Sequence, residues 1–177
     1  MTLPINPIGQ RNPQWAGKQL GTVQGRTIGS DGCTITSATM LHNYYYRVTS
    51  ITPDELNKTF TSQHLYSNGD LFVGSNFVKL FPAIRFEGIS YYPDPIPADM
   101  AKIKSHLDKG HPIFVWLYNQ GIFHCTLAVG YERDDRGVDQ IIVNDPWQGD
   151  QVRIDKRWGD SATVILEADY YSGSVKA

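Results

Sequence analysis

The first half of the chain has hydrophobic and polar residues at a helical spacing. This pattern predicts helices over about Cys33–Tyr46, from Thr52 onward and over about Ser75–Leu80. The second of these has a strong start signal. Thr52 and Glu55 have the spacing of a capping box, and Pro53 occupies the first helical position, where a missing N–H costs nothing. We therefore expect the first half to be mainly helical.

The second half begins with a helix and continues with strands. The helix is predicted over about Asp99–Lys109, and Gly110 ends it. Alternating or continuous apolar runs then predict strands over Ile113–Tyr118, Phe123–Glu132, Gln140–Asn144, Gln151–Asp155 and Ala162–Glu167. Helices followed by antiparallel strands are typical of an α+β domain, which is the predicted fold class.

The length and composition indicate one globular domain. The chain has 177 residues, of which 41% are hydrophobic and 19% charged, so it can bury a core, and disordered, collagen-like and coiled-coil structures are excluded. Residues Tyr91–Pro97 contain three prolines and read as a rigid connector. We expect one domain over residues 1–177, with a helical lobe over about residues 1–92 and a sheet lobe over about residues 98–170.

Charge and hydropathy narrow the choice of partners. The net charge is −2, and no run of like charge is long enough to bind phosphates or anionic lipids. The longest apolar stretch, Ile113–Tyr118, is too short to span a bilayer. We therefore expect a monomer that binds no nucleic acid and does not insert into a membrane.

The N-terminal residues carry no targeting signal. Met1–Pro7 has neither the basic start nor the apolar centre of a signal peptide. With no signal peptide, the protein would stay in the cytoplasm, leave by a route without a cleaved signal, or be cut from a longer chain.

The two cysteines have different settings. Cys33 follows a glycine-containing loop at a predicted helix start, where unpaired N–H groups and the helix dipole stabilise a thiolate and can also bind an oxyanion. Cys125 alternates with Leu127 and Val129 along a strand, as a core residue does. Two alternatives stay open for Cys33, which are a small buried hydrophobe and a disulfide with Cys125.

His124 is the best candidate for a base that acts on Cys33. It enters a strand just after a turn, whereas His42 lies on the helix that Cys33 begins but about 180° around its axis. Asp145 follows His124 by 21 residues, which is enough for one hairpin, so its carboxylate could orient the imidazole. Asn144 competes for that role, and a structural histidine and a turn aspartate are the alternatives.

An oxyanion would need a further donor. Gln10 has a side-chain amide that could serve together with the N–H of Cys33. Gln14 and Gln24 are rivals, and a solvated surface glutamine is the alternative.

Several short stretches together resemble the papain-like cysteine peptidases, and more closely their bacterial and phage branch related to the bacteriocin-leader (double-glycine) peptidases. The matching stretches are Gln10–Ala16, Thr27–Ser37, His111–Ile113, His124–Gly130 and Ile142–Trp147. Each is ordinary by itself, but their order and spacing form a strong joint signal.

The resemblance implies a fold and a set of roles. The fold would be an N-terminal helical lobe with the nucleophile, packed on a C-terminal antiparallel sheet with the histidine and aspartate. Cys33 would be the nucleophile, His124 the general base and then acid, Asp145 its orienting group and Gln10 the oxyanion donor. Such chemistry needs no metal or organic cofactor. Independently of the resemblance, we interpret the acidic run Glu132–Asp139 as a hairpin turn rather than a calcium site.

The same resemblance implies amide hydrolysis through a thioester. By analogy with short stand-alone domains of this branch, we expect a phage or bacterial lytic enzyme that cleaves peptidoglycan peptides and stays in the cytoplasm until released, or acts at the cell wall. Leader-processing relatives usually carry an acidic residue before the cysteine and glycine after it, whereas Gly32 and Thr34 flank Cys33 here. Alternatives are processing of protein or leader peptides, deamidation or transglutamylation, and a non-catalytic domain that binds peptide or carbohydrate.

Overall fold

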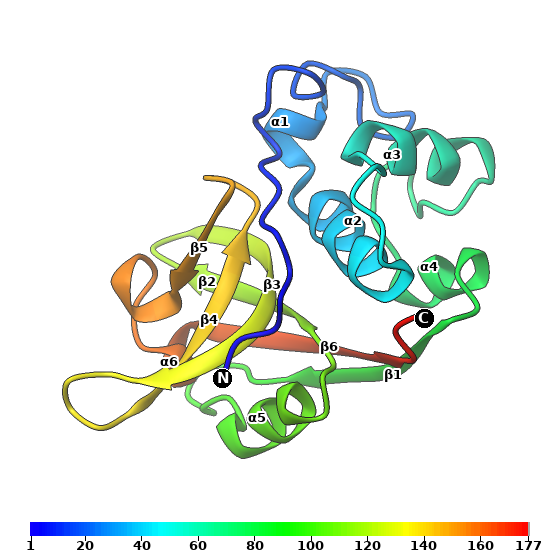
Figure 1. The fold of residues 1–177 in the computed structure, drawn as a ribbon. Helices are drawn as coiled ribbons and strands as arrows, with labels where there is room; N and C mark the ends of the chain where they lie inside the picture. The colour runs from blue at the N-terminus through cyan, green and yellow to red at the C-terminus, as the bar shows by residue number, and fades with distance from the viewer. Residues whose placement is uncertain (177) are drawn as a thin grey trace.

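The protein combines helices with one antiparallel sheet, which confirms the predicted α+β class (Figure 1). The computed structural model describes residues 1–176. The helices are α1 (Ile28–Asp31), α2 (Cys33–Tyr46), α3 (Pro53–Ser62), α4 (Gly74–Leu80), α5 (Met100–Asp108) and α6 (Ser161–Val164), with a short 3₁₀ turn, η1, at Ile154–Lys156. The strands are β1 (Ile84–Tyr91), β2 (Ile113–Asn119), β3 (Ile122–Arg133), β4 (Asp139–Asp145), β5 (Asp150–Arg153) and β6 (Ile165–Gly173).

The sheet has six strands in the order β1-β6-β2-β3-β4-β5, and every neighbouring pair is antiparallel. Figure 1 shows α2, α3 and α4 on one side of the sheet and α5 on the other. The last strand of the chain, β6, therefore lies between β1 and the β2–β3 hairpin.

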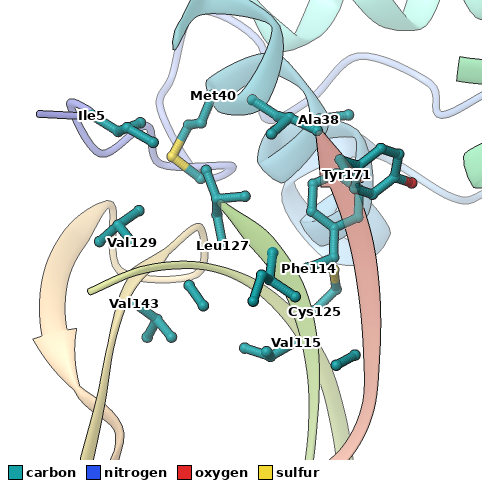
Figure 2. Packing of buried hydrophobic residues seen from close by; sticks show 14 of the residues in the cluster. Ile5, Ala38, Met40, Phe114, Val115, Cys125, Leu127, Val129, Val143 and Tyr171 are labelled. Atoms are coloured by element: carbon teal, nitrogen blue, oxygen red, sulfur yellow. The ribbon is translucent and has the colours of Figure 1, made fainter. Parts of the chain in front are cut away.

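The core lies between α2 and the centre of the sheet (Figure 2). Ala38 and Met40 come from α2, and Cys125, Leu127 and Phe114 come from β3 and β2; all are essentially inaccessible to solvent. Most of β3 is buried on both faces, which explains why its sequence reads as a continuous apolar run. This packing fixes the distance between the helix that begins at Cys33 and the strand that carries His124.

The predicted helix starts are confirmed. In α3, the N–H of Glu55 donates to the Thr52 side chain over 3.3 Å, and the Glu55 carboxylate accepts the Thr52 N–H over 2.8 Å. Pro53 occupies the first helical position, as expected.

No helix within residues 1–176 is long and apolar enough to cross a membrane.

One strand of the sheet was not expected from the sequence. Residues 84–91 form β1, so the mainly helical first half also contributes an edge strand, which pairs with β6. The even-numbered residues of β1 face inward throughout, but its large apolar residues change from Ile84 and Phe86 to Ile89 and Tyr91, which are exposed. The apolar alternation therefore breaks in the middle of the strand.

The last predicted strand also begins later than expected. Residues 161–164 form α6, because the Asp160 side chain accepts the N–H of Ala162 and caps the turn, and β6 runs from Ile165 to Gly173. Similarly, β5 ends at Arg153 and the chain turns into η1. Both differences arise from local side-chain caps and turns, which strand periodicity does not report.

Candidate active site

Cys33 is the first residue of α2 and is partly exposed. Gly32 separates α1 from α2, and a Cβ at this position would lie 2.5 Å from the carbonyl oxygen of Ile28, so only glycine fits there. The N–H groups in the first turn of a helix have no partner within that helix, and the dipole adds positive potential at this end. The junction of α1 and α2 thus presents the thiol where an anion is stabilised.

His124 and Asp145 meet across the β3–β4 pair. Leu127 lies opposite Asn144 in this register, which brings the end of β4 beside the first half of β3. The His124 Nε2 donates to Asp145 Oδ1 over 2.8 Å, and both side chains are buried. Asn144, the competing candidate, instead donates its amide to the carbonyl oxygen of Ile5 over 2.8 Å.

The other ring nitrogen of His124 is left for Cys33. Because Asp145 occupies Nε2, Nδ1 is the ring nitrogen that remains for an interaction with Cys33, whose Sγ lies 3.8 Å from Thr34 Oγ1. Burial alone would raise the pKa of the Cys33 thiol, but the hydrogen bond and positive charge of His124 and the backbone N–H of Cys125 lower it below its ordinary value. Burial alone would lower the pKa of His124, but its bonds to Asp145 and Cys33 raise it to about 9.

These opposite shifts favour a charged pair. A thiolate and an imidazolium coexist at pH values between the lowered pKa of Cys33 and the raised pKa of His124. The two groups titrate as a pair, since each charge stabilises the other. The arrangement therefore increases the thiolate fraction of Cys33 at a given pH and keeps a proton on His124.

Asp145 is held as an anion although its side chain is fully buried. Its Oδ1 also accepts the Trp147 N–H over 2.8 Å, and its Oδ2 accepts from Arg157 Nη1 over 2.7 Å and from Trp158 Nε1 over 3.4 Å. Burial alone would raise the pKa of Asp145, but the bonds from His124, Arg157 and Trp147 lower it to about 2. The carboxylate is thus ionised across the physiological range.

Two indoles enclose the imidazole. Trp158 stacks on His124 with ring centroids 5.2 Å apart and 20° between the planes, and Trp147 meets it edge-on at 5.3 Å. The sequence pattern did not indicate Trp158 or Arg157, which follow η1 and belong to no recognisable motif. The one available signal was their position just after the last strand of the β4–β5 hairpin.

Gln10 lies in the cleft with Cys33 and is almost fully buried. Its backbone N–H donates to the carbonyl oxygen of Pro146 over 2.7 Å, and its Nε2 donates to that of Gly29 over 3.1 Å. An amide nitrogen has two hydrogens, so the second remains available for another acceptor. The rivals Gln14 and Gln24 are exposed and do not line this cleft.

The cleft at these residues has a volume of about 300 Å³, and Gln10, Cys33, His124 and Trp147 all line it. Tyr66, Leu71, Phe72, Trp116 and Phe123 add an aromatic and apolar wall. A larger cavity of about 530 Å³ lies at the other end of α2 and contains none of the four. We place the candidate active site in the smaller cleft, because it joins the titrating groups with an accessible volume.

The remaining cysteine and histidines have other environments. Cys125 is a free, fully buried thiol, as its strand pattern predicted, and Cys33 is also free. His42 stacks on Tyr46, and His106 is buried and bonds to the Tyr171 carbonyl oxygen. Cys125, His42 and His106 do not line the cleft.

Comparison with protein families matches residues 3–170 to the Peptidase_C39 like family. This match confirms the relationship to bacteriocin-leader-type cysteine peptidases that the short stretches indicated, and the mixed helix and antiparallel sheet is consistent with a fold of this kind. A comparison with curated proteins gives no significant match.

The first test concerns the ionisation of Cys33. Iodoacetamide should alkylate Cys33 faster at about pH 7 than it alkylates an ordinary thiol with a pKa of about 8.5, because the lowered pKa of Cys33 raises its thiolate fraction there. In His124→Asn the stabilising charge is lost, and the rate at pH 7 should fall about tenfold. Peptide mass mapping measures the rate, with buried Cys125 as the internal control. Equal rates in the two proteins would contradict the charged pair.

A second test concerns Arg157. Replacing it in Arg157→Gln removes one of the two cations that contact the buried Asp145 carboxylate and should lower the free energy of unfolding by about 2 kcal/mol in urea at neutral pH. Arg157→Lys, which keeps the charge, should lose less. Because the native pKa of Asp145 is depressed, the stability it contributes is present above about pH 4 and is lost toward pH 2, so the wild type and Arg157→Gln should converge there. A constant difference down to pH 2 would argue against this origin.

Proposed function

Since the chain belongs to the Peptidase_C39 like family, we propose that it is a cysteine peptidase in which Cys33 is the nucleophile, His124 the general base and acid, Asp145 the orienting group and Gln10 an oxyanion donor. The observation that carries the proposal is the 2.8 Å bond between His124 Nε2 and Asp145, which leaves Nδ1 for Cys33. It selects one tautomer of the imidazole and so defines which nitrogen exchanges a proton with the substrate.

Acylation would begin with attack of the Cys33 thiolate on the carbonyl carbon of a peptide bond. The carbonyl oxygen becomes an oxyanion, and the N–H of Cys33 and the free hydrogen of Gln10 Nε2 would donate to it. His124 Nδ1 then protonates the leaving amine, the C–N bond breaks, and a thioester to Cys33 remains.

Deacylation would use the same groups in reverse. A water molecule takes the place of the leaving amine, the now neutral His124 removes its proton, and hydroxide character develops toward the thioester carbon. Collapse of the second oxyanion releases the carboxylic acid and regenerates the thiolate and imidazolium. Asp145 does not accept the proton at any step, since its pKa stays near 2 and Arg157 compensates its charge.

The substrate we propose is the peptide part of peptidoglycan, cleaved by a phage or bacterial lytic enzyme. This part of the proposal rests on analogy with short stand-alone relatives. The aromatic wall formed by Trp116 and Phe123, whose rings stack at 5.0 Å, offers a flat apolar surface beside Cys33. Such a surface suits peptide side chains and sugar faces equally well.

Purified peptidoglycan incubated with the protein should release new peptide fragments, which mass spectrometry identifies together with the bond cleaved. Cys33→Ala should lower the rate at least about 10⁴-fold, because no other group in the cleft can form the thioester. A mixture of unfolded proteins, treated in parallel, separates general proteolysis from wall lysis. Release from proteins alone would refute the lytic substrate and leave the peptidase, whereas no cleavage of either, with Cys33→Ala and wild type both folded, would refute the peptidase.

Gln10→Ala should lower kcat about 100-fold with little change in KM, because an oxyanion donor acts in the transition state rather than on the bound substrate. The hydrogen bond from the backbone N–H of residue 10 to the Pro146 carbonyl oxygen does not involve the side chain, so it persists in the variant. Gln14→Ala, an exposed neighbour, is the matched control and should retain the wild-type kcat. A change confined to KM in Gln10→Ala would assign this residue to substrate binding instead.

A further inference from the structure

Arg11 lies over the indole of Trp147 at one end of the cleft. Its guanidinium carbon is 4.3 Å from the centroid of the indole ring, and this ring meets His124 edge-on at 5.3 Å. Trp147 lines the cleft, and Arg11 is exposed and follows Gln10 directly in the chain. A cation is thus positioned one side chain away from the reacting groups.

The backbone around this cation is firmly held. Residues 9–12, here called the 9–12 loop, pack against residues 145–149, the 145–149 turn. The N–H of Gln10 donates to Pro146, and a Cβ on Gly149 would lie only 2.9 Å from the Cα of Gly9, so the two backbones touch. The indole of Trp15 also donates to the carbonyl oxygen of Gly9 over 2.9 Å. Arg11 is therefore presented from an ordered base, which reduces the entropy cost of binding through it.

The charge of Arg11 is uncompensated. Among residues 1–176, no carboxylate forms an ion pair with it. Arg26, the arginine that lines the cleft, differs in this respect, because it lies 2.9 Å from Asp70 and 4.0 Å from Asp31. Arg11 thus places an unpaired positive charge over Trp147, whereas Arg26 and its two carboxylates together are negative.

In the proposed reaction this unpaired charge lies near the path of the leaving group. In the proposed reaction His124 gives its proton to the leaving amine, so the segment that departs must pass beside His124. Trp147 contacts the imidazole, and Arg11 covers Trp147. The residues that follow the cleaved bond would therefore reach Arg11 within a short distance.

We propose that Arg11, stacked on Trp147, forms a subsite that binds a carboxylate carried by the first or second residue of the leaving segment. This inference rests on the proposed peptidase function. It defines the preferred substrate as a peptide cleaved close to a free C-terminus or before an acidic side chain.

The chemistry of the guanidinium fits this ligand. A guanidinium that stacks on an aromatic ring keeps its N–H groups in the plane of the group and directed outward, where two of them can bind a carboxylate side by side. Stacking on Trp147 also removes part of the water around the cation, which strengthens its attraction for an anion. A lysine could bridge the same distance but would lack the two parallel donors.

The first test measures binding without turnover. In ¹⁵N-labelled Cys33→Ala, the indole N–H resonance of Trp147, assigned with Trp147→Phe, is followed by NMR during titration with alanylalanine, its C-terminal amide and alanylaspartate amide. The two carboxylate peptides should bind about tenfold more tightly than the alanylalanine amide. A preference for alanylalanine or for alanylaspartate amide tells whether a terminal or a side-chain carboxylate is the ligand.

Substitution decides whether Arg11 is responsible. Adding Arg11→Gln to Cys33→Ala should reduce the preference for carboxylate over amide to about one, and Arg11→Lys should leave part of it. Arg85→Gln, which removes an exposed arginine of β1, should retain the full preference and controls for the change in net charge. Equal binding of carboxylate and amide, no response of Trp147 to any of the peptides, or a preference that survives Arg11→Gln would overturn the subsite.

A second test uses cleavage. Pairs of peptides that differ only in a C-terminal carboxylate or amide are offered to the otherwise unmodified protein and to its Arg11→Gln variant, and the ratio of kcat/KM for each pair is measured. The ratio of kcat/KM for the carboxylate peptide to that for the amide peptide should be about ten in the protein with Arg11 and about one in Arg11→Gln. Carboxylate binding without cleavage of any peptide would refute the peptidase function and support the subsite. Cleavage with a ratio of one in both proteins would support the peptidase function and refute the subsite.

Discussion

The candidate site depends on one buried carboxylate. An unpaired charge in the interior costs several kcal/mol, so the Asp145 side chain must be surrounded by donors to stay ionised. It accepts from His124, from the Trp147 N–H and from Arg157, each over less than 3 Å, and these donors come from β3, from its own turn and from the segment after η1. Satisfying this single anion therefore fixes three separate parts of the chain around it.

The same anion indirectly positions Gln10, the proposed oxyanion donor. Because Asp145 orders the turn that follows it, the carbonyl group of Pro146 is available to the N–H of Gln10, and the 9–12 loop lies against the 145–149 turn. Gln10 then reaches Gly29 in α1, just ahead of Cys33. The line of contacts from β4 through the N-terminal loop to α1 explains why residues separated by more than a hundred positions gather in one cleft.

The sequence could predict the parts of this arrangement that follow from periodicity and hairpin geometry. A start signal placed Cys33 at a helix N-terminus, and a spacing of 21 residues allowed one hairpin to join His124 to Asp145. It could not predict Arg157 or Trp158, since their contacts depend on the 3₁₀ turn that redirects the chain after β5. Nor did it reveal β1, because the apolar residues of that strand change from the inward to the outward face midway along it.

The charges at the centre alternate in space, and this order sets a compromise. The thiolate of Cys33, the imidazolium of His124, Asp145, Arg157 and then Asp150 form a chain of opposite signs, in which Arg157 binds Asp150 through both of its terminal nitrogens. A carboxylate that lies between two cations attracts each of them less strongly than it would attract one alone. Arg157 lowers the pKa of Asp145, and it thereby also weakens the pull of Asp145 on the His124 proton. In the proposed mechanism, an imidazolium held too strongly would not release its proton to a leaving amine, so we infer that Arg157 keeps His124 both protonated and able to act as the acid.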